Sequence, residues 1–231
     1  MKVLAISTSP RKGGNTDLLI DAIAAAAAEA GADVEKVSLR ELNISPCVEC
    51  NACQRLSTCR IKDDMQGLYP KITDADRIVF ATPIYFLGPC AQAKAFIDRH
   101  QAFWSKKFVL KQPLLEREFP HGRKGYLVST GGTRGQRIFE CAQRSLRNVF
   151  SVIEVKYDGE LVYRQIDEKG AILQHPTAMQ DAAEFGRRIV SVQPGPPASL
   201  PGNDPDDTGN AGVPPASSPV NLPGEDPDDI R

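Results

Sequence analysis

The sequence predicts an α/β fold in which a doubly wound, five-stranded parallel sheet carries helices on both faces. Short β-branched and aliphatic runs alternate with helical patterns along the first 192 residues. Several of these runs end in turns that contain glycine or proline. Such alternation favours parallel pairing, with right-handed crossovers that place helices on both sides of the sheet.

The strands are predicted where β-branched and aliphatic residues dominate, and the most apolar of these runs are typical of strands buried on both faces. They cover residues 2–7, 34–39, 77–81, 124–129 and 152–157. Their spacing fits the flavodoxin-like strand order 2-1-3-4-5, in which ligands bind beyond the carboxyl ends of the strands.

The helices are predicted from apolar residues that recur at three- and four-residue spacing. The first begins near Thr16 and ends before Gly31, because glycine readily takes the left-handed conformation that follows a helix. Asp63 or Asp64 can cap a second helix that reaches about Ile72. The remaining helices cover roughly residues 89–103, 136–150 and 176–192, whereas residues 104–123 give no clear pattern.

Composition divides the chain near residue 192. Residues 193–231 hold ten of the eighteen prolines and seven acidic residues against one base. This segment has too little apolar surface to offset the entropy cost of ordering it. A disordered Pro/Asp-rich tail is therefore predicted. A docking peptide for a partner is the alternative. Residues 1–192 form the predicted folded domain, which is mildly basic although the whole chain has a net charge of −1.

Several classes of protein are disfavoured by the sequence. Its apolar runs fall short of the roughly 18 residues that a membrane-spanning helix needs. The first residues, MKVLAIS, lack the apolar region and cleavage site of a signal peptide, so a cytoplasmic protein is expected. Basic residues form no stripe, so neither nucleic acid nor a membrane is expected as a partner.

The loop after the first strand has the composition of a phosphate site. Residues 7–16, STSPRKGGNT, place hydroxyls, one arginine and two glycines at the start of a helix. Backbone N–H groups and the helix dipole favour an anion there, while Ser9, Thr16 and Arg11 add donors and charge. Because the loop matches neither G-x-G-x-x-G nor G-K-[ST], a monophosphate fits best, with an ordinary βα turn as the alternative.

Two further loops are predicted at the same edge of the sheet. Residues 81–88, ATPIYFLG, combine a stiff proline, two aromatic side chains and a glycine, which suits a flat apolar ring. Residues 129–135, STGGTRG, would let a ligand lie against the backbone. Each loop alone is also typical of an ordinary turn.

These three loops resemble the FMN-binding loops of the NADPH-dependent FMN reductase family, most specifically at Ser9-Pro10-Arg11 and Gly14-Asn15-Thr16. The resemblance implies bound FMN, with its phosphate on the first loop and its ring along the second, and NAD(P)H as a possible cosubstrate. The implied cofactor-binding residues are Ser9, Arg11, Asn15, Thr16, Thr82, Pro83, Ile84, Tyr85, Phe86, Thr130, Gly131 and Gly132. Arg134 lies where it could meet a nicotinamide cofactor's phosphate.

A cysteine-rich loop occupies residues 44–62. Its cysteines, at x2, x2 and x5 spacing, are Cys47, Cys50, Cys53 and Cys59. Clustered thiols in a reducing compartment more often serve metal or redox chemistry than disulfides. Three cysteines at x2 spacing can surround three corners of a cubane, so one [4Fe–4S] cluster is predicted. Zinc and free redox-active thiols are the alternatives.

The same segment resembles the iron–sulfur flavoproteins, a branch of the same family. The resemblance implies an oxidoreductase that forms a homodimer or homotetramer and takes electrons from NAD(P)H or a ferredoxin-like protein. Its acceptor would be a redox small molecule or another redox protein. A cluster-free FMN or quinone reductase, and a non-enzymatic electron carrier or redox sensor, are the alternatives.

Other reactive side chains are predicted to be structural or solvated. Cys90 and Cys141 are expected to be buried small hydrophobes. The three histidines, His100, His121 and His175, show no metal-ligand spacing. Trp104, with Lys106 and Lys107, is expected to form a helix end, the alternatives being a flavin cover or a subunit contact. No acid–base catalyst is identified.

Overall fold

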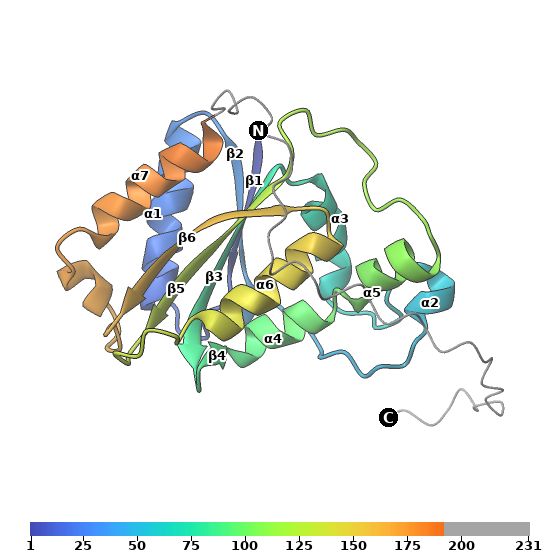
Figure 1. Ribbon diagram of the computed structural model, residues 1–231, viewed down its shortest axis with the longest axis horizontal. Coiled ribbons are helices and arrows are strands. Elements are labelled where there is room, and N and C mark those ends of the chain that lie inside the picture. The colour runs from blue at the N-terminus through green and yellow to red at the C-terminus, as the bar shows by residue number, and fades with distance from the viewer. Residues whose placement is uncertain (192–231) are drawn as a thin grey trace, which may run out of the picture. The chain divides into compact units, whose positions relative to one another are not determined.

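The computed structural model describes residues 1–191, with a parallel sheet at the centre of this part of the chain (Figure 1). The strand order is β2-β1-β3-β5-β6. These strands are β1 (Lys2–Ser7), β2 (Asp33–Ser38), β3 (Arg77–Tyr85), β5 (Lys124–Gly131) and β6 (Lys156–Arg164). If only these parallel strands are numbered in chain order, the order is the predicted 2-1-3-4-5. The predicted tail lies outside the described residues.

A short strand, β4 (Gly88–Pro89), was not predicted and forms a hairpin with the end of β3. Phe86 and Leu87 make the two-residue turn, with φ angles of 49° and 62°. Such turns usually carry Asn or Gly, because few residues adopt positive φ readily. The Phe-Leu pair therefore gave no hairpin signal.

The predicted fifth strand was wrong in position. Val152 ends the helix over Glu140–Val152, Ile153 and Val155 pack into the core, and the strand β6 begins only at Lys156. Most of β6 is only half-buried, because it forms an edge of the sheet. A strand in that position needs few apolar residues, so the sequence KYDGELVYR shows no long apolar run.

Helices cover both faces of the sheet (Figure 1). The longer ones are α1 (Asn15–Glu29), α3 (Met65–Asp74), α4 (Ala91–Asp98), α6 (Glu140–Val152) and α7 (Ala178–Val190). The sheet has a hydrophobic core on each face, and successive side chains of β1 point into opposite cores. Val3 packs with α1 and α7, and Leu4 packs with α3, α4 and α6. None of the helices within residues 1–191 is long and apolar enough to span a bilayer.

Shorter helical pieces replace part of one predicted helix. The single helix expected over residues 89–103 is split into α4 and α5 (Gln101–Trp104), and Pro89 belongs to β4. A π-helical turn, Ser105–Val109, follows α5. The cysteine loop contains the four-residue helix α2 (Cys53–Leu56), and 3₁₀ turns cover Leu39–Glu41 and Ala171–Gln174.

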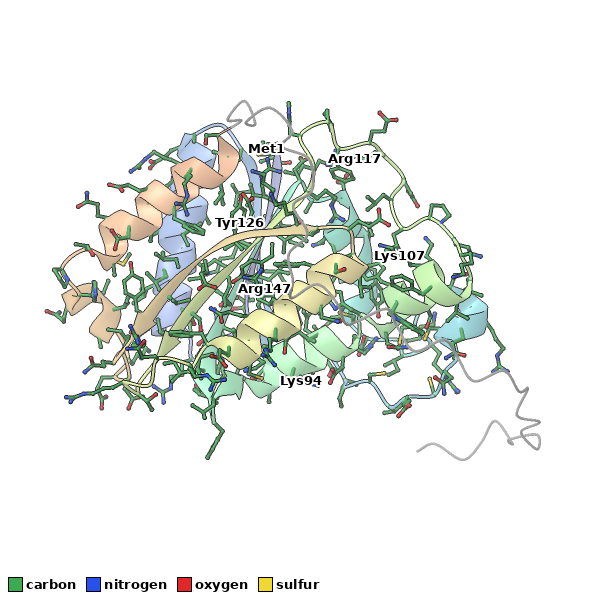
Figure 2. The ribbon with its side chains drawn as sticks, in the orientation of Figure 1. Met1, Lys94, Lys107, Arg117, Tyr126 and Arg147 are labelled. Atoms are coloured by element: carbon green, nitrogen blue, oxygen red, sulfur yellow. The ribbon has the colours of Figure 1, made fainter. Side chains whose placement is uncertain are left out.

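Two buried arginines bind helix ends at the amino edge of the sheet. Arg77 donates from Nε to Ile189 O at 2.9 Å, at the end of α7. Arg123 donates to backbone carbonyls that include Ala75 O at 2.9 Å, just after α3. Burial lowers the pKa of Arg123 to about 10, so it stays charged at neutral pH. Arg117 lies near Met1 at this edge and pairs with Asp74 (Figure 2).

Close packing of α1 and α7 leads to a stability prediction at Gly186. A Cβ on Gly186 would lie 2.4 Å from Ile23 O and 2.9 Å from Ala26 Cβ. Gly186→Ala should therefore lower the free energy of unfolding by about 2–3 kcal/mol, because the helices must separate. In the control Gly67→Ala, the new Cβ meets nothing within 4 Å.

Gly67 is an exposed residue inside α3, so alanine there should stabilise the protein by about 0.5–1 kcal/mol. Urea unfolding of both variants measures the two changes. Equal midpoints for the two variants would contradict the described packing of α1 against α7.

Candidate functional site

Loops from four strands meet at a depression beyond the carboxyl ends of β1, β3, β5 and β6. All of the predicted cofactor-binding residues except Thr82 and Phe86 line it. Parallel pairing brings these loops together, with Pro83 of β3 directly opposite Thr130 of β5. The structure thus places the three sequence motifs in one site.

The two exceptions lie close to the depression. Thr82 is fully buried, and its hydroxyl donates to Pro83 O at 3.1 Å and accepts from Cys90 N at 3.4 Å. Phe86 lies at the tip of the β3–β4 hairpin and is wholly exposed. Thr82 is thus a buried residue near the end of β3, and Phe86 lies on the outer surface.

The phosphate loop makes a tight turn that leaves little room for a side chain at position 14. Ser9 Oγ accepts a hydrogen bond from Arg11 N at 3.2 Å, and Gly14 N donates to Arg11 O at 3.0 Å. A Cβ on Gly14 would lie only 3.0 Å from Ser9 Oγ and 3.1 Å from Arg11 O. The turn leads directly into α1, whose first N–H groups have no acceptor within the helix.

Thr16 offers a donor to whatever occupies this loop. Its side chain is 1% exposed, and its Oγ1 has no hydrogen-bond partner among the described residues. Leaving a buried hydroxyl unsatisfied costs about 1–3 kcal/mol, so such a group suggests a ligand. A phosphate at the start of α1 would accept from this hydroxyl and from the backbone. The residues present therefore fit the phosphate of FMN.

Asp17 stabilises the conformation of the phosphate loop through hydrogen bonds. Its carboxylate accepts from Ser7 Oγ at 2.7 Å and from Gly13 N at 3.0 Å. Burial alone would raise the pKa of Asp17, but these hydrogen bonds and the Lys36 ammonium hold it below its usual value. The charged carboxylate thus keeps Gly13 in place, at a φ of 65°.

The segment after β6 supplies residues that the sequence reasoning missed. Ile166, Asp167 and Lys169 line the depression. Asn15 holds this segment, since its amide donates to Glu168 O at 2.9 Å and accepts from Ile172 N at 3.2 Å. Correct placement of β6 would have put residues 165–170 at the same sheet edge.

Lys169 adds positive charge to the phosphate loop. Its Cε lies 3.8 Å from the point where a Cβ on Gly13 would stand. With Arg11 on the loop itself, two cationic side chains therefore line the depression. This charge favours a dianionic phosphate.

The rest of the depression suits a flat ring. Pro83, Ile84 and Tyr85 line one part, and small residues of the β5 loop line another. A Cβ on Gly132 would lie 3.0 Å from Asp167 Cγ, so the Asp167 side chain packs against that glycine backbone. Apolar surface beside exposed backbone matches the needs of an isoalloxazine ring.

A second depression, of about 810 Å³, includes residues of the amino edge of the sheet. Its charged side chains pair with one another, as Lys2 does with Asp74 and Lys71 with Glu35. Ligands of open parallel sheets bind at the opposite edge. We therefore place the candidate site at the carboxyl edge.

The four clustered cysteines line one pocket. The loop that carries them follows the carboxyl end of β2 and turns sharply at Glu49, Asn51 and Ser57, whose φ angles are 53°, 54° and 59°. Positive φ is costly for most residues and concentrates at functional sites. These turns bring Cys47, Cys50, Cys53 and Cys59 to a common cavity.

An ion pair closes the base of the cysteine loop. Arg99 Nη1 lies 2.5 Å from Asp63 Oδ2 and donates to Ser45 O at 2.9 Å. Asp63 also accepts from Ser45 N at 2.9 Å. Burial alone would raise the pKa of Asp63, but the hydrogen bonds from Arg99 and Ser45 hold it below its usual value. The two ends of the loop are thus fixed to each other.

The thiols do not converge on a single point. Within residues 1–191, no three Cys, His, Asp or Glu side chains are placed to hold one metal ion. A tetrahedral zinc site would need four ligands about 2.0–2.3 Å from one ion. A four-iron cluster takes one thiolate on each iron, so its ligands surround a larger volume. The pocket is lined by four cysteines, which is the number of thiolates that such a cluster requires.

The two cysteines outside the motif, Cys90 and Cys141, differ in burial. Cys90 is buried and lies 3.3 Å from Thr8 Oγ1, as expected for a small core residue. The prediction for Cys141 was wrong, because it is exposed. It precedes the buried residue Ala142 on α6, and adjacent helical positions point about 100° apart.

His100, His175 and Trp104 have structural positions. His100 is buried, and its pKa is lowered to about 4 by that burial, so the ring is neutral. His175 accepts hydrogen bonds from Thr177 N and Ala178 N at the start of α7. Trp104 ends α5 and does not line the depression beyond β1, β3, β5 and β6.

Comparison with known proteins gives consistent results. The family model described as NADPH-dependent FMN reductase matches residues 1–162. An iron–sulfur flavoprotein of Methanosarcina thermophila is 30% identical over 199 residues, covering 83% of this chain and 95% of that protein. One from Methanocaldococcus jannaschii is 42% identical over 99 residues, covering 43% and 51%.

Solved structures share the fold. The NAD(P)H:quinone oxidoreductase from Methanothermobacter marburgensis has a TM-score of 0.60 at 16% identity. The comparison covers 82% of this chain and 98% of that one. Likeness at this identity shows the sheet and helices in common and carries no further conclusion.

Proposed function

The chain belongs to the NADPH-dependent FMN reductase family, and from this premise we propose that it is an FMN-dependent oxidoreductase with a [4Fe–4S] cluster. Its donor would be NAD(P)H or a ferredoxin-like protein. Its acceptor would be a small redox molecule or another redox protein. The relatives named iron–sulfur flavoproteins support the cluster.

One observation carries the proposal: two separate sites are built on loops that follow the strands. The depression after β1, β3, β5 and β6 contains the buried, unsatisfied Thr16 hydroxyl. The loop after β2 brings four cysteines to one pocket. The first set of residues fits a flavin phosphate, and the second fits an inorganic cluster.

When bound, FMN would supply hydride acceptance and the cluster would supply one-electron exchange. The chain's own residues hold and orient these groups. Thr16, Arg11 and Lys169 would bind the phosphate, while Pro83 and Tyr85 would lie along the ring. The four cysteine thiolates would bind iron, and the Arg99–Asp63 pair fixes the loop that carries them.

A second candidate is a cluster-free NAD(P)H-dependent FMN or quinone reductase. It is favoured by the arrangement of the cysteine thiols, which among the described residues form no group able to bind a single metal ion. Iron and sulfide analysis of protein purified without air separates the two candidates. About four irons per chain support the cluster, and none supports the second candidate.

Anaerobic stopped-flow mixing tests whether the protein is an enzyme. The FMN-loaded protein is mixed separately with NADH, NADPH and reduced ferredoxin, and flavin absorbance is followed. Rapid bleaching by one donor, followed by turnover with a quinone, supports the proposal. A flavin that no donor bleaches would instead indicate a carrier or redox sensor.

Arg11→Ala should weaken FMN binding about tenfold, because it removes a charge-assisted contact to the phosphate from an exposed, partly screened position. Lys12→Ala is the matched control, since Lys12 is also exposed but does not line the depression. Fluorescence titration of the apoproteins with FMN gives both affinities. Equal losses in the two variants would show that general charge, not Arg11, attracts the cofactor.

We also propose that the chain forms a homodimer or homotetramer. The support is the hairpin tip beside the FMN depression, where Tyr85, Phe86 and Leu87 are 41%, 107% and 61% exposed. Contiguous exposed apolar groups are typical of protein interfaces. Light scattering of the holoprotein should give two or four chains, and Phe86→Ser should shift the mass toward one chain. A monomeric holoprotein would contradict this expectation.

A further inference from the structure

Arg99 is an unusual constituent of the cysteine pocket. It lines the pocket together with the four cysteines, yet its side chain is fully buried. A buried guanidinium must have its N–H groups satisfied, because each unsatisfied one costs free energy.

Four of the five guanidinium N–H groups are accounted for. Nη1 donates to Asp63 Oδ2 and to Ser45 O, at 2.5 and 2.9 Å. Nη2 donates to Asp63 Oδ1 at 3.0 Å and approaches Ile61 O at 3.5 Å. The fifth, on Nε, has no partner among the described residues. This unpartnered N–H therefore belongs to a residue that lines the cysteine pocket.

We propose that Arg99 Nε–H donates a hydrogen bond to a sulfur atom of the cluster held by Cys47, Cys50, Cys53 and Cys59. This inference rests on the proposed cluster. Donors to cluster sulfur stabilise the reduced, more negative state and so raise the reduction potential. Arg99 would therefore set the potential of the cluster in addition to closing its loop.

The guanidinium lines the same pocket as the four thiols, and its orientation is fixed. The ion pair with Asp63 fixes the plane of the guanidinium, so Nε cannot turn toward another acceptor without breaking that pair. The donor is thus held in place before the cluster forms.

The first test compares Arg99→Lys with Arg60→Lys in the reconstituted protein. Both substitutions conserve charge at residues that line the pocket, but Arg60 is exposed. Spectroscopic redox titration should show a lower cluster potential in Arg99→Lys only. At the wild-type midpoint its ratio of reduced to oxidised cluster should fall about tenfold, which is roughly 59 mV for one electron.

A purely structural role would lower the unfolding temperature of Arg99→Lys and leave the potential unchanged, which would overturn the proposal. If that variant does not fold, pulsed EPR of the reduced cluster in ¹⁵N-arginine-labelled Arg60→Lys protein replaces it. Coupling to an arginine nitrogen supports the donor, and its absence overturns it. A wild-type protein without iron would refute the cluster itself, whereas an unshifted potential refutes only the role of Arg99.

Discussion

Cys53→Ala is expected to abolish the cluster and to leave FMN bound. Cys53 is the first residue of α2 and lines the cysteine pocket, with its Sγ 3.2 Å from Ser105 Oγ. Three remaining thiolates cannot complete the four-cysteine ligand set. Iron and sulfide per chain should therefore fall from about four to near zero, while flavin content stays at wild-type level.

Cys141→Ala is the matched control for that variant. Cys141 is also a free cysteine, is exposed, and does not line the cysteine pocket. Its iron content should equal that of the wild type. Retention of a full cluster in Cys53→Ala would refute the assigned ligands, and loss of iron in both variants would indicate nonspecific binding by free thiols.

Thr16→Val should produce opposite effects on the apoprotein and on the holoprotein. Without a ligand, the Thr16 hydroxyl is buried and unsatisfied, so its replacement by a methyl group should stabilise the apoprotein by about 1 kcal/mol. With FMN present the hydroxyl becomes a phosphate donor. Its loss should raise the Kd for FMN about tenfold, which corresponds to ~1.4 kcal/mol.

Calorimetric unfolding of apoprotein and FMN titration measure these two effects independently. Thr73→Val is the control, because its hydroxyl donates to Pro70 O at 3.1 Å, on α3 and away from the depression. That variant should bind FMN as the wild type does. Unchanged FMN affinity in Thr16→Val would remove this hydroxyl from the phosphate site.

Most of the fold could be predicted because the central strands are apolar and are bounded by clear turns. The run from Lys2 to Ser7 was placed correctly to the residue, since each end coincides with a change in composition. The edge strand β6 was misplaced because partial burial leaves it polar. The β3–β4 hairpin was missed because its turn residues, Phe86 and Leu87, rarely adopt positive φ.

The same errors explain what was missing from the candidate site. Residues 166–169 follow β6, so misplacing that strand hid the approach of Lys169 to the phosphate loop. Arg99 lies far in sequence from the cysteine loop, and only the tertiary structure shows that its ion pair with Asp63 closes that loop. Motifs within one loop were recognisable, whereas contacts between distant segments were not.

We propose that one chain holds FMN on its phosphate loop and an iron–sulfur cluster on its cysteine loop. The most direct measurement is the visible spectrum, with flavin, iron and sulfide content, of protein purified without air. We expect one flavin and about four irons and four sulfides per chain. A colourless protein that stays colourless after incubation with FMN, iron and sulfide would contradict it.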